Sequence, residues 1–202
     1  MTELNADLDL YLASASPRRA DLLRQIGLRF EVISDLDVDE SPLNSESPEE
    51  YVQRLAHDKA IAGYSRLSFV AGHGQPAAVP PVLGADTCIV VDDEILGKPK
   101  GRDEGIAMLQ RLSGRSHEVL TAICLADGRS EKQSLSRTSV TLKALKADEI
   151  VCYWESGEPV DKAGAYAIQG LAARFVTYLQ GSYSGVVGLP LYELSELLLC
   201  DH

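Results

Sequence analysis

The sequence predicts an α/β protein built around a mixed β-sheet. Apolar runs of strand length alternate along the chain with amphipathic segments of helical period. Two β-rich segments, residues 116–125 and 133–142, are separated by Asp127-Gly128, a dipeptide typical of tight hairpins. Strands joined through helices usually lie parallel and hairpin strands lie antiparallel, so we expect both orientations in one sheet.

Two Ser-Pro pairs mark the helices of the first half. In Ser16-Pro17 and Ser47-Pro48, serine is a favoured N-cap, and proline at the first helical position lacks an amide hydrogen that would have no partner there. The expected helices cover residues 17–27 and 48–67. The expected strands cover residues 8–13, 29–33 and 82–96, the last divided by a turn at Asp92-Asp93.

The second half continues the alternation. Residues 102–112 form an amphipathic segment that Ser113-Gly114 closes, as expected at a helix end. A Gly/Pro/Ala-rich stretch, residues 71–81, predicts an exposed loop between a helix and a strand. The remaining expected elements are helices over residues 147–157 and 190–200, a strand over 175–179, and a loop with a short helix over 161–170.

The chain is acidic. Its 202 residues carry 19 Lys and Arg against 30 Asp and Glu, a net charge of −11, which opposes binding to nucleic acid or to an anionic membrane. Any bound phosphate must therefore meet a local cluster of cations. No apolar run approaches the roughly 20 residues of a membrane span and the N-terminus is acidic, so we expect a cytoplasmic protein. We expect one domain over residues 1–202, either undivided or with two lobes around a central cleft.

The four cysteines are expected to be reduced thiols of the core. Cys88, Cys124, Cys152 and Cys200 stand far apart, without a C-x-x-C pair or a histidine at zinc-ligand spacing. Cys88 and Cys124 lie inside apolar runs, where a thiolate is disfavoured. A metal-binding or catalytic role is therefore not expected for them.

The segment from Ser14 to Arg19 joins the first strand to the first helix and suits a phosphate. A helix N-terminus presents free amides and the positive end of the helix dipole. Acidic residues are favoured in a first helical turn, so Arg18 and Arg19 are misplaced electrostatically unless an anion lies beside them. An ordinary helix cap with two solvated arginines explains the local pattern equally well.

Four charged residues, Glu40, Lys59, Asp86 and Lys98, form a second candidate group. Asp86 interrupts an almost wholly apolar strand, so its carboxylate must be paired, metal-bound or catalytic. Glu40 lies in an acidic stretch and, taken alone, is better explained as a solvated residue. Lys98 follows a strand exit, where a surface lysine and a phosphate ligand are both compatible with the pattern.

The segment 161–170 mixes Gly, Ala and a charged pair without a clear period, so its side chains are expected to make contacts from a loop. Gln169 is suited to a base edge, because an amide offers both a donor and an acceptor. A structural contact between Asp161 and Lys162 is the alternative.

Two other patterns are rejected as functional motifs, and the role of His117 stays open. Gly72–Ala77 matches a dinucleotide-binding G-x-G-x-x-A, but the prolines that follow exclude the helix that a phosphate would need. Pro99 follows Lys98 where a P-loop requires Ser or Thr. His117 fits either a site or a strand edge, and no Ser-His-Asp set is evident.

The motifs together resemble those of the Maf family. In order along the chain, they are Leu12-Ala-Ser-Ala-Ser-Pro-Arg-Arg19, Asp39-Glu40, Lys59, Gly84-Ala-Asp-Thr87, Gly97-Lys-Pro99, Leu112-Ser-Gly-Arg-Ser-His117 with Thr121, Asp161 to Gly170, and Gly181-Ser-Tyr with Val187-Gly-Leu-Pro190. The resemblance implies a cytoplasmic nucleoside triphosphate pyrophosphatase whose elongated α/β fold is shared with inosine triphosphate pyrophosphatases. It further implies a divalent metal, Mg²⁺ or Mn²⁺, and a homodimer. Maf proteins are also named as septum formation inhibitors.

The resemblance also suggests roles for single residues. Asp86 is the expected proton acceptor for the attacking water, and Glu40 and Asp86 are the expected metal ligands. The expected substrate-binding residues are Ser14, Ser16, Arg18, Arg19, Glu40, Lys59, Thr87, Lys98 and Gln169.

Three positions favour one substrate branch of this family. Arg18, Thr87 and Gln169 match the dTTP/UTP branch, whereas the 7-methyl-GTP branch carries an aromatic residue, Gln and Glu at the matching places. We therefore expect dTTP and UTP as substrates and no nucleic-acid partner. The alternatives are an inosine or xanthosine triphosphate pyrophosphatase of the same fold and a non-catalytic regulator of septum formation.

Overall fold

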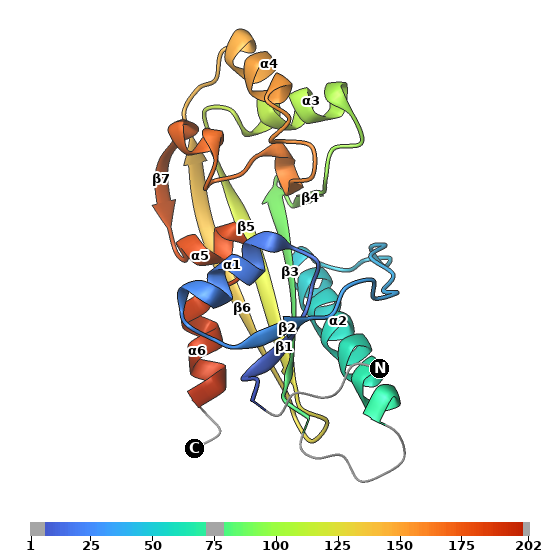
Figure 1. The fold of residues 1–202 in the computed structure, drawn as a ribbon. Coiled ribbons are helices and arrows are strands. Elements are labelled where there is room, and N and C mark those ends of the chain that lie inside the picture. Colours follow the sequence, from blue (N-terminus) through green and yellow to red (C-terminus); the bar gives the residue numbers. More distant parts are fainter. Residues whose placement is uncertain (1–6, 72–78, 200–202) are drawn as a thin grey trace.

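Within residues 7–71 and 79–199, which the computed structural model describes, a seven-stranded sheet runs through the molecule (Figure 1). Its strands are β1 (Leu10–Ala13), β2 (Phe30–Val32), β3 (Val82–Val91), β4 (Glu94–Leu96), β5 (Ser116–Ala126), β6 (Glu131–Leu142) and β7 (Val176–Gln180). The order is β2-β1-β3-β5-β6-β7, and β4 pairs with β3. β1 runs parallel to β2 and β3, while β3 with β4 and β5, β5 with β6, and β6 with β7 are antiparallel. The expected mixed sheet is confirmed.

Helices cover both faces of the sheet. They are α1 (Pro17–Gln25), α2 (Pro48–Ala71), α3 (Arg102–Leu112), α4 (Ala147–Glu155), α5 (Tyr183–Val187) and α6 (Leu191–Leu199), with short 3₁₀ helices η1 (Ala163–Ala165) and η2 (Leu171–Phe175). α2 packs across β3 and β5 on one face, and α1, α5 and α6 lie on the other (Figure 1). α3 packs against α4 and η1 at one end of the elongated molecule. In the described part of the chain, no helix combines the length and apolarity needed to cross a bilayer.

The expected turns and helix starts are largely confirmed. α1 and α2 begin at the prolines of the two Ser-Pro pairs, and Asp92 and Asp93 take the left-handed φ values of 54° and 61° that a tight hairpin needs. α5 was not expected from the sequence. It is short and lacks an apolar period, and its start is fixed by the Ser182 hydroxyl, which accepts the Gly185 N–H at 3.0 Å. The motif at residues 72–77 and Cys200 lie outside the described residues.

Gly84 allows α2 to lie directly against β3. A Cβ at this position would meet the Ala56 carbonyl oxygen at 2.1 Å and the Ala60 amide nitrogen at 2.5 Å. Any larger side chain would therefore push the helix away from the strand. The close packing brings the middle of α2, which carries Lys59, over the part of β3 that carries Asp86.

The prediction for the cysteines is correct for two of the described residues and wrong for a third. Cys88 and Cys124 are free and buried, and burial raises the pKa of each thiol to about 12. Cys152 is free but exposed. The apolar stripe of α4 is formed by Ile150 and Tyr153, and Cys152 falls outside it on the solvent side.

Candidate active site

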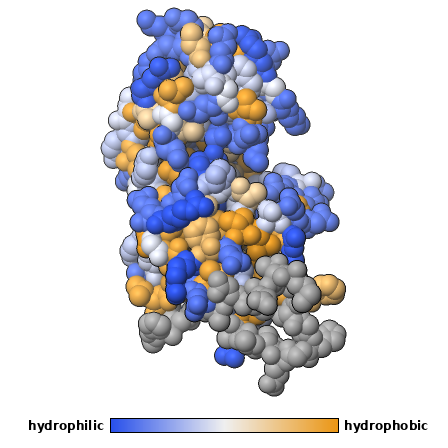
Figure 2. Space-filling view, in the orientation of Figure 1, coloured by the Kyte–Doolittle hydropathy of each residue, from blue (hydrophilic) through white to orange (hydrophobic). Residues whose placement is uncertain are grey.

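The site lies where one edge of β3 has no neighbouring strand. On this edge, β1 pairs with β3 as far as Gly84, and β4 pairs with it from Ile89 onward. β5 lies along the opposite edge throughout. Residues 85–88 are therefore open on one side, so that Asp86 and Thr87, which point to opposite faces of the sheet, reach the same space. A cavity of about 700 Å³ opens here, and Figure 2 shows a mainly hydrophilic surface around the notch in this part of the molecule.

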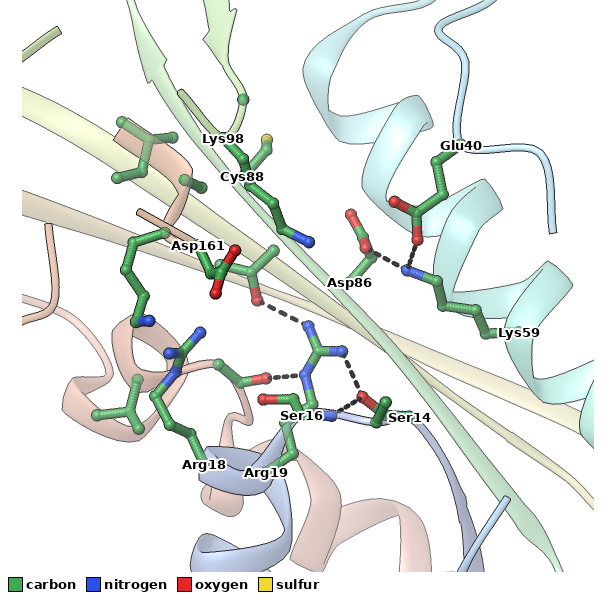
Figure 3. Close-up of a pocket in the computed structure, with 18 of the residues that line it drawn as sticks. Ser14, Ser16, Arg18, Arg19, Glu40, Lys59, Asp86, Cys88, Lys98 and Asp161 are labelled. Atoms are coloured by element: carbon green, nitrogen blue, oxygen red, sulfur yellow. Dashed lines mark hydrogen bonds and ion pairs between the residues drawn. The ribbon is translucent and has the colours of Figure 1, made fainter. Parts of the chain in front are cut away.

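Lys59 joins two carboxylates at the α2 side of the cavity. Its ammonium lies 2.7 Å from Asp86 Oδ1 and 2.7 Å from Glu40 Oε1 (Figure 3). Asp86 is only 9% exposed, whereas the Glu40 side chain is 54% exposed. Burial raises the pKa of Glu40, but the hydrogen bond from Lys59 and the charges of nearby cations outweigh it and hold that pKa below its usual value. Glu40 is therefore not an isolated solvated residue.

Arg19 links three elements at the floor of the cavity. Its Nε donates to the Gly188 carbonyl at 2.8 Å, Nη1 to Ser14 Oγ at 3.1 Å and Nη2 to Thr87 Oγ1 at 3.4 Å. These bonds hold the start of α1 against β3 and the end of α5. Burial lowers the pKa of Arg19 and the charge of Asp86 raises it. Arg19 is thus a fixed positive charge whose orientation the protein sets in advance.

The hydroxyl of Thr87 belongs to a chain of hydrogen bonds. Thr121 Oγ1 lies 3.0 Å from Thr87 Oγ1 and 2.8 Å from the Gly185 carbonyl oxygen. Thr121 is the donor in both contacts, so its single proton is shared between the Gly185 carbonyl and Thr87 Oγ1. Thr87 Oγ1 accepts from Thr121 and also from Arg19. Thr121 was not among the expected site residues, although it faces Thr87 across the β3-β5 ladder.

Four cations in the cavity have no ion-pair partner among the residues that the structure describes: Arg18, Arg19, Lys98 and Lys162. Figure 3 shows Lys98 and Arg18 entering the cavity from different sides. Burial lowers the pKa of Arg18, and the charge of Asp161 raises it. Burial and then the charge of Arg18 lower the pKa of Lys162. Partly desolvated cations that repel one another are stabilised by a polyanion placed between them.

The N-terminus of α1 faces the same space. Ser16 is the N-cap, but its side chain makes no capping hydrogen bond, and the first turn contains no acidic residue. Ser14 Oγ instead accepts the Ser16 N–H at 3.2 Å as well as Arg19 Nη1. Both serines lie below Asp86 and Lys59 in Figure 3. The arrangement favours an anion at the helix start over the alternative of a plain cap with solvated arginines.

The segment that carries Gln169 forms the remaining wall. Gly164 has a φ of +63° and donates its N–H to the Gly97 carbonyl at 3.0 Å, beside Lys98. Tyr166 is buried, and its hydroxyl lies 2.7 Å from Nε2 of His117 on β5. His117 is therefore a buried residue rather than a strand-edge one. Gln169 lines the cavity and remains exposed, and its amide has no hydrogen-bond partner within residues 7–71 and 79–199.

A divalent cation fits the pair of carboxylates that Lys59 joins. The ammonium shows that a positive charge is held between Glu40 and Asp86. Mg²⁺ commonly takes one or two carboxylates together with waters and substrate oxygens. No group of three or more His, Cys, Asp or Glu suited to a metal occurs in the described segments. A metal at this place would therefore take most of its ligands from the substrate and from water.

The expected site residues come together in space. All of them line the single cavity described above, namely Ser14, Ser16, Arg18, Arg19, Glu40, Lys59, Asp86, Thr87, Lys98 and Gln169. Lys162 also lines it but was overlooked, because the segment 161–170 lacks a periodic pattern. The charged pair Asp161-Lys162 beside Gly and Ala was the available signal. The combination of fixed cations, a buried carboxylate and an amide suits a phosphorylated ligand that also carries a polar ring.

Comparisons with known proteins agree with this description. The family model described as Maf-like protein matches residues 9–200. A dTTP/UTP pyrophosphatase of Alkalilimnicola ehrlichii is 52% identical, over 94% of this chain and 91% of its own. A dTTP/UTP pyrophosphatase of Pseudoalteromonas atlantica is 50% identical, over 94% and 95%. The solved Ham1 protein of Staphylococcus aureus superposes with a TM-score of 0.51 at 13% identity, covering 96% of this chain and 99% of its own, so the overall fold is similar.

Proposed function

Since the chain belongs to the Maf-like protein family, we propose that its cavity hydrolyses dTTP and UTP to the nucleoside monophosphate and pyrophosphate. The resemblance seen in the sequence motifs is confirmed by the family match. Relatives that are half identical over nearly the whole chain carry the name dTTP/UTP pyrophosphatase. The cavity is compatible with such a substrate in size and charge.

One observation carries the proposal: a nearly buried carboxylate, Asp86, faces a cavity whose other charged groups are mainly cations. A triphosphate would neutralise the four cations of the cavity that have no ion-pair partner in the described part of the chain. It would also explain how an acidic chain binds a polyanion, because the attraction is local while the rest of the surface repels nonspecific nucleic acid.

In the proposed reaction, a water oxygen attacks the α-phosphorus. The bond from this phosphorus to the bridging oxygen of the β-phosphate breaks, and pyrophosphate leaves with that electron pair. Asp86 accepts the proton of the attacking water. Pyrophosphate is a stable leaving group, so the barrier lies mainly in the charge on the phosphoryl oxygens and in the orientation of the water. Arg18, Arg19, Lys98 and Lys59 supply the compensating positive charge.

We propose Glu40 and Asp86 as the residues that hold a divalent metal, Mg²⁺ or Mn²⁺. When bound, such an ion would neutralise phosphate charge as a Lewis acid. Lys59 keeps the two carboxylates close together when no metal is bound. With a metal between the two carboxylates, the Lys59 ammonium would be free to lie beside the phosphates and offset their negative charge.

We assign the base to the wall formed by Gln169 and Thr87. Both residues line the cavity. The Gln169 amide can donate to O4 and accept from N3–H of uracil or thymine. Thr87 Oγ1 accepts from Thr121 and from Arg19, and these two bonds fix its place in the wall of the pocket.

A panel of nucleoside triphosphates tests the proposal. Purified protein with Mg²⁺ is assayed for inorganic phosphate with and without an added inorganic pyrophosphatase. We expect dTTP and UTP to give phosphate only when the coupling enzyme is present, because the direct product is pyrophosphate. Direct release of orthophosphate, or preference for ITP or XTP, would contradict the proposal. The homodimer, the cytoplasmic location and a link to septum formation stay predictions.

A further inference from the structure

Glu40 lies on a segment that no sheet or helix holds. The chain between β2 and α2 has no regular secondary structure from residue 33 to 43. In the described chain, residues 34–42 make no backbone–backbone hydrogen bond outside helices and strands. The position of a carboxylate that is 2.7 Å from Lys59 must therefore be set by side chains.

Two side chains of α2 bind three consecutive carbonyl groups around Glu40. The Tyr51 hydroxyl donates to the carbonyl of Glu40 itself at 3.0 Å. Arg54 Nη2 donates to the Ser41 carbonyl at 3.1 Å, and Nη1 donates to the Asp39 carbonyl at 3.5 Å. The backbone on both sides of Glu40 is thus tied to the first two turns of one helix.

The guanidinium of Arg54 is itself held in place. Its Nε and Nη2 donate to the two carboxylate oxygens of Glu46 at 2.6 and 2.9 Å, a bidentate geometry that fixes the plane of the group. The side chains of Arg54 and Glu46 are 22% and 7% exposed. Glu46 also accepts the Leu43 N–H at 3.0 Å, so the carboxylate that binds Arg54 also holds the end of the segment in place. Most exposed ion pairs lack this combination of burial and bidentate contact.

The helix that holds Glu40 also carries the residue that pairs with it. Lys59 follows Arg54 along α2, and its ammonium contacts Glu40 and Asp86. We propose that Arg54 and Tyr51 are positioning residues which set the place of the Glu40 carboxylate relative to Asp86. This inference rests on the proposed function for its kinetic effect, because it assigns Glu40 to that reaction. It extends the site to the first two turns of α2, where Tyr51 lines the cavity and Arg54 lies outside its lining.

A double-mutant cycle tests the proposal through Glu40. We expect Arg54→Gln to lower kcat for dTTP about 10- to 100-fold, since displacement of a catalytic group by about 1 Å costs that much. Arg54→Lys keeps the charge but loses the fork, and we expect a similar loss. In a Glu40→Gln background, Arg54→Gln should change kcat by less than about twofold, because the carboxylate that Arg54 positions is already absent. Equal losses in both backgrounds would overturn the proposal, since they would mean a general structural role.

Hydrogen–deuterium exchange gives a readout that needs no activity. We expect faster exchange in peptides covering residues 35–46 of R54Q, with unchanged exchange in β3. Arg66→Gln is the matched control: Arg66 lies on the same helix and donates to the Ser34 carbonyl at 2.7 Å, farther from Glu40. It should free the start of the segment and leave kcat within about twofold. Unchanged exchange in R54Q would overturn the proposal.

If R54Q does not fold, Tyr51→Phe is the variant that tests the same proposal. It removes one hydroxyl, and we expect a smaller loss of kcat that is also absent in the Glu40→Gln background. An unaltered kcat and unaltered exchange in Y51F would remove Tyr51 from the proposal. If R54Q shows the expected faster exchange but the wild-type protein hydrolyses no nucleoside triphosphate, the proposed function fails while the positioning of Glu40 stands.

Discussion

The Lys59 ammonium and the Asp86 carboxylate form an ion pair at 2.7 Å in which both side chains are nearly buried, 15% and 12% exposed. The same ammonium contacts Glu40, so one cation compensates two carboxylates from different segments. A pair of this kind costs desolvation and is lost when either partner is removed. Its place beside an open strand edge indicates a site kept charged for a ligand rather than a contact that serves stability.

We predict that Asp86→Asn abolishes most turnover and leaves the fold intact. Asparagine keeps the size of the side chain and its hydrogen bond with Lys59 but cannot accept a proton at neutral pH. Loss of a general base typically costs 10²- to 10⁴-fold, so kcat at saturating dTTP should fall by about two decades or more. The measurement is steady-state kinetics with thermal unfolding as the control for folding. Near full turnover by D86N would refute the assignment.

Removal of Lys59 should destabilise the folded protein. In Lys59→Met, two carboxylates lose the cation between them, and the free energy of unfolding should fall by about 2–4 kcal/mol at neutral pH. The double variant K59M with D86N should recover part of this loss, because only Glu40 then remains charged. Urea denaturation of the wild type and the three variants provides the comparison. Equal destabilisation of K59M and the double variant would contradict the pairing.

Metal dependence should be traceable to Glu40. We expect exhaustive EDTA treatment to remove hydrolysis and Mg²⁺ or Mn²⁺ to restore it. Glu40→Gln should raise the Mg²⁺ concentration for half-maximal activity about 10-fold or more, as expected for the loss of one of few protein ligands. Titration at fixed dTTP separates this shift from a change in kcat. Undiminished hydrolysis after EDTA would remove the metal from the scheme.

The fold could be predicted in outline because most of its signals are local. Ser-Pro pairs set the starts of α1 and α2, and Asp92-Asp93 sets a turn, by interactions within a few residues. Asp86 was recognisable because a carboxylate in an apolar strand needs a partner. α5 escaped notice because a single hydroxyl from Ser182 starts it and no period follows.

The contacts of the site could not be predicted in the same way. Lys59 meets Asp86 only because Gly84 lets α2 approach β3, a relation between residues far apart in the chain. Nothing in the sequence around Glu40 shows that Arg54 would bind the carbonyls beside it. Such contacts depend on tertiary packing, whereas patterns in a sequence report the local preferences of the backbone.

His117 should make stability depend on pH. It is 3% exposed, and burial, with a smaller effect from the charge of Arg115, lowers its pKa to about 4 from an ordinary value near 6.5. Nδ1 has no hydrogen-bond partner in the described part of the chain. As the pH falls from about 6.5 to 4, the unfolded chain takes up the proton first, so the folded state loses up to about 3 kcal/mol.

The comparison with His117→Asn isolates this effect. Carboxylates with lowered pKa values also make the folded state lose stability in acid, but they contribute equally to both proteins. The difference in the free energy of unfolding between wild type and H117N should therefore shrink or reverse between pH 7 and pH 4.5, in urea titrations at each pH. Parallel pH profiles of the two proteins would contradict the assignment of a buried neutral histidine.

Selectivity for the base should depend on Gln169. Cytosine presents the inverse of the uracil edge, and a site built for one pattern leaves its own groups unpaired against the other, at a cost of several kcal/mol and orders of magnitude in kcat/KM. We expect dTTP and UTP well ahead of CTP, ATP and 7-methyl-GTP. Arg18 also offers no aromatic platform for a methylated guanine cation.

In Gln169→Glu the amide donor is lost, so kcat/KM for UTP should fall about 10-fold or more. Inhibition by inorganic triphosphate, which has no base, should stay unchanged and is the internal control. Equal kcat/KM for CTP and UTP in the wild type would contradict this assignment, because it would mean that the bound state does not hold the Gln169 amide in the one orientation that matches uracil.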